Sequence, residues 1–498
     1  MTAAADHPGP GLLGIDLGTS SVKVVVTDTN AKVLAHVTQP YNVDHPHPQW
    51  SETNPASWWD AVADATRQAV AIARVRVAGI GLSGQMHGVV ITDAAGALLR
   101  PAVLWSDSRA IELVEIYRRL PSDTQRRLAN PLSPGMFGPI LGWLARHEPQ
   151  TYARARWALS PKDWIRFRLT GELAAEPSDA SATLLYDLPG DTWALEVADA
   201  LGIDTSLLPP VQPHAADCAG ILQPAAAAAL DLPPSIPVAA GGGDTAVAAF
   251  GAGLTAAGQA QLTIGTGIQI VAPVAAVDLP SAAPVTHLYR AATDTGWYRM
   301  AAGLNGGSTL EWVRQLFNAT WAELYATAAQ PAAADDPLFL PQLVGERTPY
   351  MDTTLRGSWA YLDPRHDRAT MLRSALEGVA LTTRAAWSAL QDAGCTADAL
   401  RLAGGGTVAP AWQQMLADAL QVELQPVDVA AASGRGAALL AGRAAGLFDE
   451  AAALKLVAPS GQTRNITPDT GPAAVLMADR FARFERLLYA ESAAASVG

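Results

Sequence analysis

The chain has 498 residues, of which 49% are hydrophobic and 16% charged. A chain of this length and composition can bury a large core, and it lacks the high charge and low hydropathy that mark disorder. Its 47 acidic residues exceed its 34 basic ones, and only four residues are lysine. This balance excludes a sequence-independent nucleic-acid binder, because neutralising phosphates requires clustered Lys and Arg.

Three features of the sequence bear on its location. Residues 1–11 lack the basic and apolar regions of a signal peptide, and no stretch of 18 or more uninterrupted apolar residues predicts a membrane span. The two cysteines, Cys218 and Cys395, lie far apart in no recognisable pattern, which favours free thiols over a disulfide. We therefore expect a cytoplasmic protein that has no membrane partner.

The first elements in chain order are predicted strands. Apolar residues at 12–17 and 22–26 flank a Gly-Thr-Ser-Ser turn, and this pattern predicts a β-hairpin, which residues 30–40 extend by a third strand. Ser57 is the expected cap of a helix over residues 58–74, in which apolar residues recur at helical spacing. Strand-like runs follow at residues 75–82, 89–92 and 98–105.

The rest of the chain divides into a helical stretch and a second half that contains strands. Residues 108–230 are mostly helical in pattern, with proline breaks, and a strand enters a glycine turn at 237–244. Residues 259–271 repeat the strand, glycine turn, strand pattern of the N-terminus. Helices are predicted near 368–393, 410–420 and 434–447. We expect two domains, 12–238 and 239–490, with the boundary near residue 238.

Two common nucleotide-binding motifs are excluded. A P-loop requires Gly-Lys-Ser/Thr, and none of the four lysines follows a glycine. Residues 79–84 fit the pattern G-x-G-x-x-G after a strand, but the dinucleotide site also requires a helix to follow, and a β-like run follows instead. Phosphate binding would therefore depend on backbone amides, helix N-termini and Mg²⁺.

Four glycine clusters and two carboxylates remain as candidate site features. Asp16 ends a buried strand beside a turn of small residues, and a buried Asp is costly without a hydrogen bond or a Mg²⁺ ion. Asp244 follows three glycines at the mouth of another strand, residues 265–267 offer amides and a hydroxyl, and residues 404–406 would let a flat ligand lie against backbone. Each cluster alone is typical of a turn; four in this order with two carboxylates favour a ligand site.

At this point the chain resembles the FGGY carbohydrate kinases, over about residues 12–445, and within that family the xylulokinases. The phosphate and adenosine motifs are common to the whole superfamily, whereas Gln-Met-His-Gly with a downstream Trp-Ser-Asp is more specific. The segments that carry the resemblance are 14–21, 48–52, 58–59, 84–88, 104–107, 160–163, 241–244, 264–267, 345–349 and 402–406.

The resemblance implies an α/β fold of two actin-like (ribonuclease H-like) domains, as in the sugar kinase, Hsp70 and actin superfamily, with an interdomain cleft. It implies ATP-dependent phosphorylation of D-xylulose at its 5-hydroxyl, with Asp244 as the catalytic base, Mg²⁺ and ATP bound, and a homodimer. The sugar site would contain Met86, His87, Trp105, Asp107, Asp244 and Thr245. The Mg²⁺ ligands would be Asp16 and Asp244, the ATP phosphates would face Thr19, Ser20, Gly265, Thr266 and Gly267, and the adenosine would face Gly405 and Gly406.

One departure from the family pattern keeps alternatives open. Xylulokinases usually have Asn after the catalytic Asp, where this chain has Thr245. Because that position borders the sugar site, the substrate could be another ketose or a pentitol, such as ribulose, arabinitol or ribitol. A non-catalytic sugar or nucleotide sensor on the same fold is a further alternative, against which the intact Asp16 and Asp244 argue.

Overall fold

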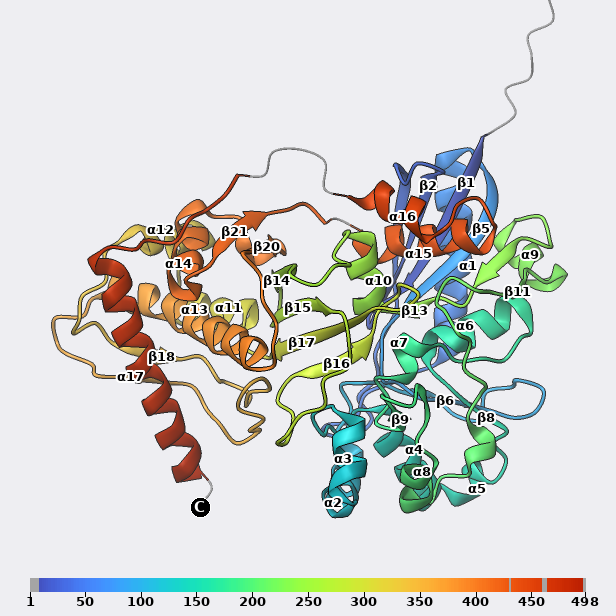
Figure 1. The fold of residues 1–498 in the computed structure, drawn as a ribbon, viewed down its shortest axis with the longest axis horizontal. Helices are drawn as coiled ribbons and strands as arrows, with labels where there is room; N and C mark the ends of the chain where they lie inside the picture. Colours follow the sequence, from blue (N-terminus) through green and yellow to red (C-terminus); the bar gives the residue numbers. More distant parts are fainter. Residues whose placement is uncertain (1–8, 430, 459–463, 496–498) are drawn as a thin grey trace, which may run out of the picture.

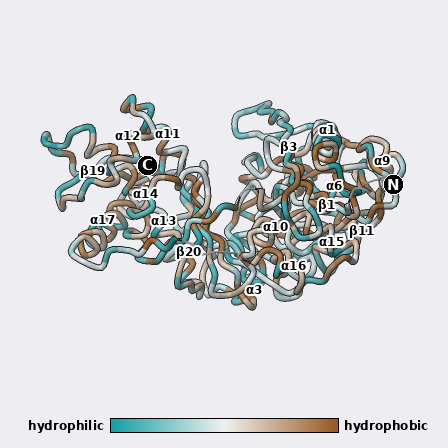
Figure 2. Tube along the Cα trace, turned by 90° about the horizontal axis from the view of Figure 1, so that it is seen from above, coloured by the Kyte–Doolittle hydropathy of each residue, from teal (hydrophilic) through white to brown (hydrophobic). Residues whose placement is uncertain are grey.

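The computed structural model describes residues 9–429, 431–458 and 464–495. The expectation that residues 1–11 contain no signal peptide therefore falls mostly outside the described residues. The chain forms two α/β lobes, each built around one sheet (Figure 1). Seen from above, hydrophobic segments run through the interior of both lobes (Figure 2). Two sheet-containing domains of this kind confirm the predicted actin-like fold class.

The sheet of the first lobe has seven strands. Six of them lie in the order β11-β12-β5-β1-β2-β3. The seventh, β13, pairs with the C-terminal end of β5, on the same side of β5 as β12. β1 runs antiparallel to β2, which confirms the predicted hairpin, and parallel to β5. The strands are β1 (Pro10–Leu17), β2 (Ser21–Asp28), β3 (Val33–Pro40), β5 (Arg76–Gly84), β11 (Cys218–Ile221), β12 (Pro237–Ala239) and β13 (Gly242–Gly243).

Helices and short strands surround this sheet, and α1 packs against β2 and β3. These elements are β4 (Glu52–Thr53), α1 (Pro55–Ala73), β6 (Val90–Thr92), β7 (Ala102–Val103), the 3-10 helix η1 (Arg109–Leu113), α2 (Val114–Arg119), α3 (Ser122–Leu128), α4 (Phe137–His147), α5 (Pro149–Tyr152), β8 (Trp157–Leu159), α6 (Pro161–Thr170), α7 (Pro177–Ala180), β9 (Tyr186–Asp187), β10 (Thr192–Trp193), α8 (Leu195–Leu201), η2 (Thr205–Leu207), α9 (Pro224–Leu230) and α10 (Asp244–Gly251).

A late segment of the chain returns to the first lobe. Helix α15 (Ala432–Ala444) packs on β1 and β5, and α16 (Glu450–Val457) lies beside it (Figure 1). Glycines make this contact possible: a Cβ added to Gly14 would lie 1.9 Å from the Gly434 oxygen, and one added to Gly81 would lie 1.9 Å from the Ala437 oxygen. Gly14 and Gly81 therefore allow a helix to lie directly on the sheet.

The sheet of the second lobe has six strands in the order β16-β17-β15-β14-β20-β21. Its first two strands form the predicted second hairpin, antiparallel with Ile264 opposite Ile268. The strands are β14 (Ala260–Ile264), β15 (Ile268–Val274), β16 (His287–Arg290), β17 (Trp297–Gly303), β20 (Ala399–Ala403) and β21 (Glu423–Pro426). The other elements of this lobe are α11 (Gly307–Leu316), α12 (Trp321–Ala326), η3 (Thr327–Ala329), β18 (Leu338–Leu340), β19 (Ser358–Ala360), α13 (Arg368–Asp392), η4 (Gly405–Thr407), α14 (Pro410–Leu420) and α17 (Pro472–Ala495).

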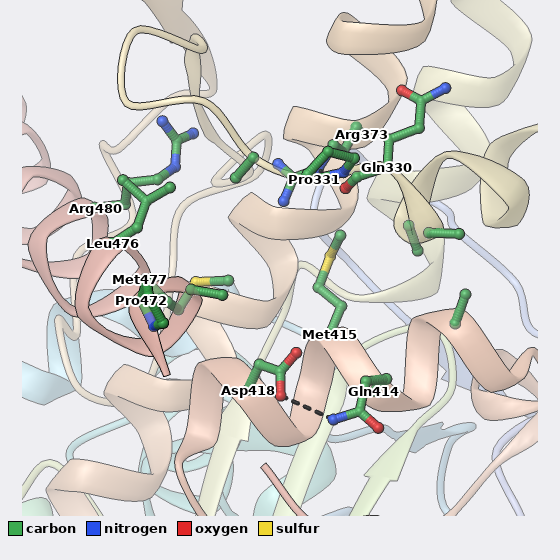
Figure 3. A pocket seen from close by; sticks show the side chains of 15 residues that line it. Gln330, Pro331, Arg373, Gln414, Met415, Asp418, Pro472, Leu476, Met477 and Arg480 are labelled. Atoms are coloured by element: carbon green, nitrogen blue, oxygen red, sulfur yellow. Dashed lines mark hydrogen bonds between the residues drawn. The ribbon is translucent and has the colours of Figure 1, made fainter. Parts of the chain in front are cut away.

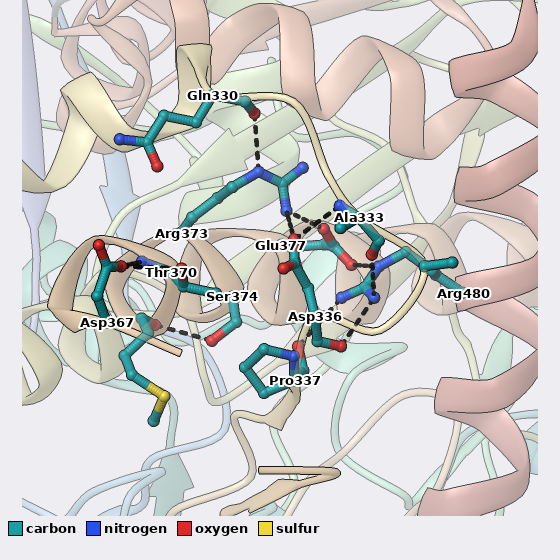
Figure 4. A network of polar contacts seen from close by, with 12 residues as sticks. Gln330, Ala333, Asp336, Pro337, Asp367, Thr370, Arg373, Ser374, Glu377 and Arg480 are labelled. Carbon is teal, nitrogen blue, oxygen red and sulfur yellow. Dashed lines mark hydrogen bonds and ion pairs between the residues drawn. The ribbon is translucent and has the colours of Figure 1, made fainter. Parts of the chain in front are cut away.

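A buried ion-pair network fastens α17 to the second lobe (Figure 4). The Glu377 carboxylate on α13 accepts from Arg373 Nη1 at 2.6 Å and from Arg480 Nε. Arg480 also donates to the Asp336 oxygen at 3.0 Å and to the Pro337 oxygen at 3.1 Å. One carboxylate thus connects two buried guanidinium groups from helices about a hundred residues apart in the chain.

Several expectations about element boundaries were wrong. Asn54, whose side chain accepts from Ala56 N, caps α1, whereas Ser57 lies within the first turn and its hydroxyl donates to the Asn54 carbonyl. Of the strand expected over residues 98–105, only Ala102–Val103 forms one. The domain boundary near residue 238 stays a prediction; the strands of the first sheet extend to Gly243 and those of the second begin at Ala260.

Two expectations related to location can be compared with the structure. Cys218 is exposed and Cys395 is buried, and neither forms a disulfide, which confirms the prediction of free thiols. Within the described ranges, no helix is both long and apolar enough to cross a membrane.

Glu377→Gln should destabilise the protein strongly, because it removes the charge that both buried arginines share while it keeps the side-chain shape. We expect a loss of about 3 kcal/mol or more in the free energy of unfolding, measured by urea denaturation. Glu311→Gln removes a partner of Arg314 at the surface and should cost about 1 kcal/mol or less. Equal losses in the two variants would contradict a special role for the buried network.

Candidate active site

The carboxyl ends of β1, β5 and β13 meet at one edge of the first sheet. Ser83 of β5 lies opposite Asp16 on one side and opposite Gly242 on the other. Gly243 is the last residue of β13, and Asp244 is the first residue of α10. The register of three neighbouring strands therefore brings the two candidate carboxylates, which are 228 residues apart in the sequence, to the same edge.

Asp16 is buried at the end of β1 with 6% of its surface exposed. Its Oδ1 accepts a hydrogen bond from the Ser83 hydroxyl at 2.8 Å. Burial raises the pKa of Asp16, and the Ser83 bond and the charge of Lys23 oppose that rise. Ser83, the partner of Asp16, was not singled out by the sequence motifs; its place next to the end of a predicted strand was the available signal.

Asp244 is a half-buried residue at the start of α10. Its Oδ1 accepts from its neighbour Thr245, from the backbone N at 2.6 Å and from the hydroxyl at 3.3 Å. Burial, and after it the charge of Asp16, raises the pKa of Asp244 to about 7. A carboxylate with a pKa near neutrality can accept a proton in a reaction and release it afterwards.

Thr245 connects Asp244 to the second lobe. Its hydroxyl accepts from Gln269 Nε2 at 3.3 Å, and the same amide nitrogen lies 3.2 Å from Met300 Sδ. Gln269 lies on β15 and Met300 on β17, both in the second sheet. Gln269 is thus a further residue beside the site that sequence motifs did not single out.

Met86 and His87 follow the end of β5 after one residue, Gln85, and Met86 lies against Gly243. A Cβ added to Gly243 would be 2.9 Å from Met86 Cγ, so the Met86 side chain lies against the residue that precedes Asp244. His87 has a φ of +73°, an uncommon conformation for a residue other than glycine. Its Nδ1 lies 2.7 Å from the Ala182 carbonyl. Because a carbonyl only accepts, Nδ1 must carry the proton, and Nε2 of the neutral ring is left as an acceptor.

Polar groups from the second lobe face His87. Tyr289 packs beside the His87 ring with centroids 6.1 Å apart, and its hydroxyl contacts His287 Nδ1 at 2.7 Å. The Arg347 guanidinium lies 5.6 Å from the centre of the Trp105 ring. Burial, together with the nearby Arg347 charge, lowers the pKa of His87 to about 4, so the ring is neutral at physiological pH. The Gly-Glu-Arg-Thr-Pro motif was the sequence signal for Arg347, although no role had been assigned to it.

Trp105 and Asp107 have different surroundings. The Trp105 indole donates to the Thr19 hydroxyl at 2.9 Å, so this side chain connects the predicted sugar and phosphate residues. The Asp107 side chain is completely buried and accepts from Ser51 N at 2.7 Å and from the Arg109 guanidinium at 2.7 and 2.9 Å. The structure therefore does not place Asp107 among the groups around Asp244; its carboxylate supports the segment that carries Trp105.

The two hairpin turns present amide groups outward. In the second turn, the Gly265 carbonyl accepts from Gly307 N at 2.9 Å and the Thr266 carbonyl from Ser308 N at 3.0 Å, while Gly267 O accepts from Gly265 N at 3.0 Å. Within the described part of the chain, the N–H groups of Thr266 and Gly267 have no partner. A Cβ added to Gly265 would meet open space. The turn can therefore donate to an anion that approaches its backbone.

The first turn is built in the same way. The Ser20 carbonyl accepts from Tyr41 N at 3.0 Å, and the Gly18 carbonyl accepts from Gln85 Nε2 at 3.1 Å and from the Tyr41 hydroxyl. The N–H groups of Thr19 and Ser20 have no partner among the described residues. Both turns thus direct their carbonyls into the protein and keep donors for a ligand.

The glycine run at residues 404–406 borders a cavity. A cavity of about 540 Å³ lies beside Gly404 and Gly405, between Leu402, Gln413 and the segment 426–429. Gly405 has open space where a Cβ would be, and the Gly406 carbonyl accepts from Trp412 Nε1 at 2.9 Å. A flat ring could therefore approach the backbone at Gly405, while the adenosine roles of Gly405 and Gly406 stay predictions.

A second cavity, of about 530 Å³, lies between α13, α14 and α17 (Figure 3). Its lining includes Arg373, Met415, Met477 and Arg480, and its polar groups are largely engaged in the network around Glu377. None of the predicted site residues lines it. We therefore place the candidate site at the edge of the first sheet.

The residues at this edge fit a Mg²⁺ ion. Asp16 and Asp244 supply carboxylate oxygens, the ligands that Mg²⁺ prefers. Burial raises the pKa of both groups, so their charged forms are disfavoured unless a cation lies nearby. Among the described residues, no group of three or more His, Cys, Asp or Glu side chains could hold a metal. An ion at this edge would therefore need further ligands from outside the protein, such as phosphate oxygens and water.

Comparison with known proteins agrees with this geometry. Two sequence models of the FGGY family of carbohydrate kinases match, that of the N-terminal domain over residues 12–251 and that of the C-terminal domain over residues 260–445. The xylulose kinase of Klebsiella pneumoniae is 35% identical over 463 residues, 92% of this chain and 94% of that protein. That of Escherichia coli is 33% identical over 437 residues, 87% of this chain and 89% of that protein. The crystal structure of a xyloylose kinase from Brucella ovis is similar with a TM-score of 0.88 and 33% identity, covering 96% of this chain and 99% of that one.

The lowered pKa of His87 predicts a pH dependence of stability. Unfolding restores the usual pKa near 6.5, so the unfolded chain binds a proton that the folded one does not, and stability falls as the pH drops from about 6.5 toward 4. His87 should contribute at most about 1.4 kcal/mol per pH unit to this fall. His87→Gln should flatten the dependence, measured by urea denaturation at several pH values, with His47→Gln at an exposed position as the control. An unchanged slope in His87→Gln would contradict the assignment.

Proposed function

Because this chain belongs to the FGGY family of carbohydrate kinases, we propose that it transfers the γ-phosphoryl group of ATP to the 5-hydroxyl of D-xylulose. Similarity to xylulose kinases over about nine-tenths of the chain supports this substrate. The observation that carries the proposal is the pair of carboxylates, Asp16 and Asp244, at one sheet edge beside amide-donating turns. A cytoplasmic location and a homodimer stay predictions.

Asp244 is the proposed general base. A sugar hydroxyl is a poor nucleophile, and Asp244 would accept its proton as the bond to γ-phosphorus forms. The pKa of about 7 suits this task, because the base must be unprotonated at the start and able to hold the proton afterwards. Most of the rate enhancement in phosphoryl transfer comes from positioning and charge neutralisation.

The phosphates of ATP are the proposed ligands of the two hairpin turns. The N–H groups of Thr19 and Ser20 in the first turn, and of Thr266 and Gly267 beside Gly265 in the second, can donate to phosphate oxygens. Mg²⁺, when bound by Asp16 and Asp244, would neutralise phosphate charge. Gly405 lines the cavity that we propose for the adenosine, and Gly406 is the next residue in the chain.

The sugar is proposed to lie against Met86, His87, Trp105 and Thr245. His87 Nε2 can accept a hydrogen bond from a sugar hydroxyl, because the ring is neutral and Nδ1 is held by the Ala182 carbonyl. Met86 and the face of Trp105 supply apolar surface, on which the C–H groups of a sugar can pack. Asp107, whose carboxylate is occupied by Arg109 and Ser51, would act here only by positioning Trp105.

Thr245 keeps one alternative open within the same family. The hydroxyl of Thr245 is engaged with Asp244 and Gln269, and it replaces the Asn that xylulokinases usually have. Ribulose, arabinitol or ribitol could therefore be a better substrate. A non-catalytic sugar sensor is a more remote alternative.

A substrate panel decides between these sugars. We expect the purified protein to release ADP fastest with D-xylulose when it is assayed with ATP, Mg²⁺ and a set of pentuloses and pentitols. A ketopentose or polyol that turns over much faster than D-xylulose would replace it as the substrate. No turnover with any sugar would favour the sensor.

Asp244→Ala should lower kcat for sugar-dependent ADP release by about 10²- to 10⁴-fold, because it removes the general base. Asp123→Ala is the matched control: it makes the same change in the first turn of α3, where Asp123 forms only an exposed ion pair with Arg126. The control should keep wild-type activity. Unimpaired activity in Asp244→Ala would contradict the assigned role.

A further inference from the structure

We propose that Ser178 and the buried charged residues behind it act as a positioning unit for Asp244. The inference rests on the proposed function and extends it to a set of residues that do not touch substrate. The unit consists of Lys162, Asp163 and Arg166 on α6, and of Glu176, Ser178 and Asp179 at α7.

Ser178 holds the residue next to the base. The Gly243 N–H donates to Ser178 Oγ at 2.9 Å, and Gly243 directly precedes Asp244. The Ser178 hydroxyl in turn donates to Glu176 Oε1 at 2.8 Å. The fit is tight, because a Cβ added to Gly242 would lie 2.9 Å from Ser178 Oγ. Ser178 therefore determines where α10 begins.

Arg166 holds the other end of the same glycine segment. Its Nη1 donates to the Ala240 carbonyl at 2.9 Å and to Asp163 Oδ1 at 2.7 Å. The segment from Ala240 to Gly243 is thus fixed at both ends by side chains of one buried cluster. Two anchors of this kind leave the glycines little freedom to move.

The anchors are connected to each other by Lys162. Its ammonium group lies 2.7 Å from Asp163 Oδ1, 3.4 Å from Glu176 Oε1 and 3.3 Å from Asp179 Oδ2. Lys162, Arg166, Glu176 and Ser178 have no exposed surface. A buried ion-pair cluster adds little net stability, since desolvation offsets the attraction, but it does require one geometry.

Asp244 depends on this geometry because its own carboxylate has few other anchors. Its described hydrogen bonds come only from Thr245, the next residue. Side-chain placement therefore follows backbone placement at Gly243. In catalysis by positioning, a displacement of about 1 Å can lower the rate on the order of 100-fold.

The test compares Ser178→Ala with wild type in the sugar-dependent ADP release assay. We expect kcat to fall about 10- to 100-fold, with KM for ATP and for the sugar within about threefold of wild type. Ser178→Thr, which keeps the hydroxyl, should restore most of kcat. Hydrogen exchange of peptides that cover residues 239–246 should be faster in Ser178→Ala, which reports the lost anchor independently of activity.

Ser374→Ala is the matched control. Ser374 is also a buried serine that accepts from an N–H, Trp359 Nε1 at 3.0 Å, and donates to a carbonyl, Met371 O at 2.8 Å, but it lies in the second lobe. It should leave kcat and the exchange of residues 239–246 unchanged. Equal effects of the two Ser→Ala variants on kcat, or an effect of Ser178→Ala confined to KM, would overturn the positioning role. A wild-type protein inactive on every sugar would instead overturn the proposed function.

Discussion

Repulsion between Asp16 and Asp244 is built into the register of the first sheet. Because β5 pairs with β1 on one side and with β13 on the other, both carboxylates reach the same edge. Burial raises the pKa of each, and the charge of Asp16 adds to the rise at Asp244. A cation bound here would relieve this repulsion, with phosphate oxygens of the proposed ATP as further ligands. Both hairpin turns have their carbonyls tied inward, so that in the proposed function their backbone N–H groups would contact the phosphates.

Local pattern was enough to predict much of this architecture. Apolar runs on both sides of a small-residue turn favour a hairpin, and both predicted hairpins form. The long helix α13 also agrees with the helix predicted near residues 368–393. The helix cap was wrong because two polar residues, Asn54 and Ser57, can each cap an N-terminus, and Pro55 favours the earlier start. Asp16 and Asp244 were singled out by local pattern, since each lies where a predicted strand ends, whereas Met86 and His87 were indicated only by the family resemblance.

Contacts between distant segments were beyond this kind of prediction. Nothing near Ser178 in the sequence indicates that it binds Gly243, 65 residues later. Gly14 lies within an apparent phosphate motif, yet its missing side chain serves the packing of α15, which joins the first lobe from near the end of the chain. Asp107 shows the reverse problem: its motif suggests a sugar contact, but Arg109 two residues later occupies the carboxylate. Burial and partners, which decide both cases, depend on tertiary structure.

Both lobes contribute residues to the proposed sugar site. Thr245 belongs to α10, which packs with the first lobe, and its hydroxyl is bonded by Gln269 from the second sheet. The Asn usual at this position in the resembled xylulokinases would offer a separate donor and acceptor, whereas the Thr245 hydroxyl is already engaged at both Asp244 and Gln269. In the proposed site, recognition of sugar hydroxyls would then fall more heavily on His87, whose neutral state is favoured by burial and by the charge of Arg347. A shift of one lobe against the other would therefore change the surroundings of both the proposed base, Asp244, and the proposed sugar ligand, His87.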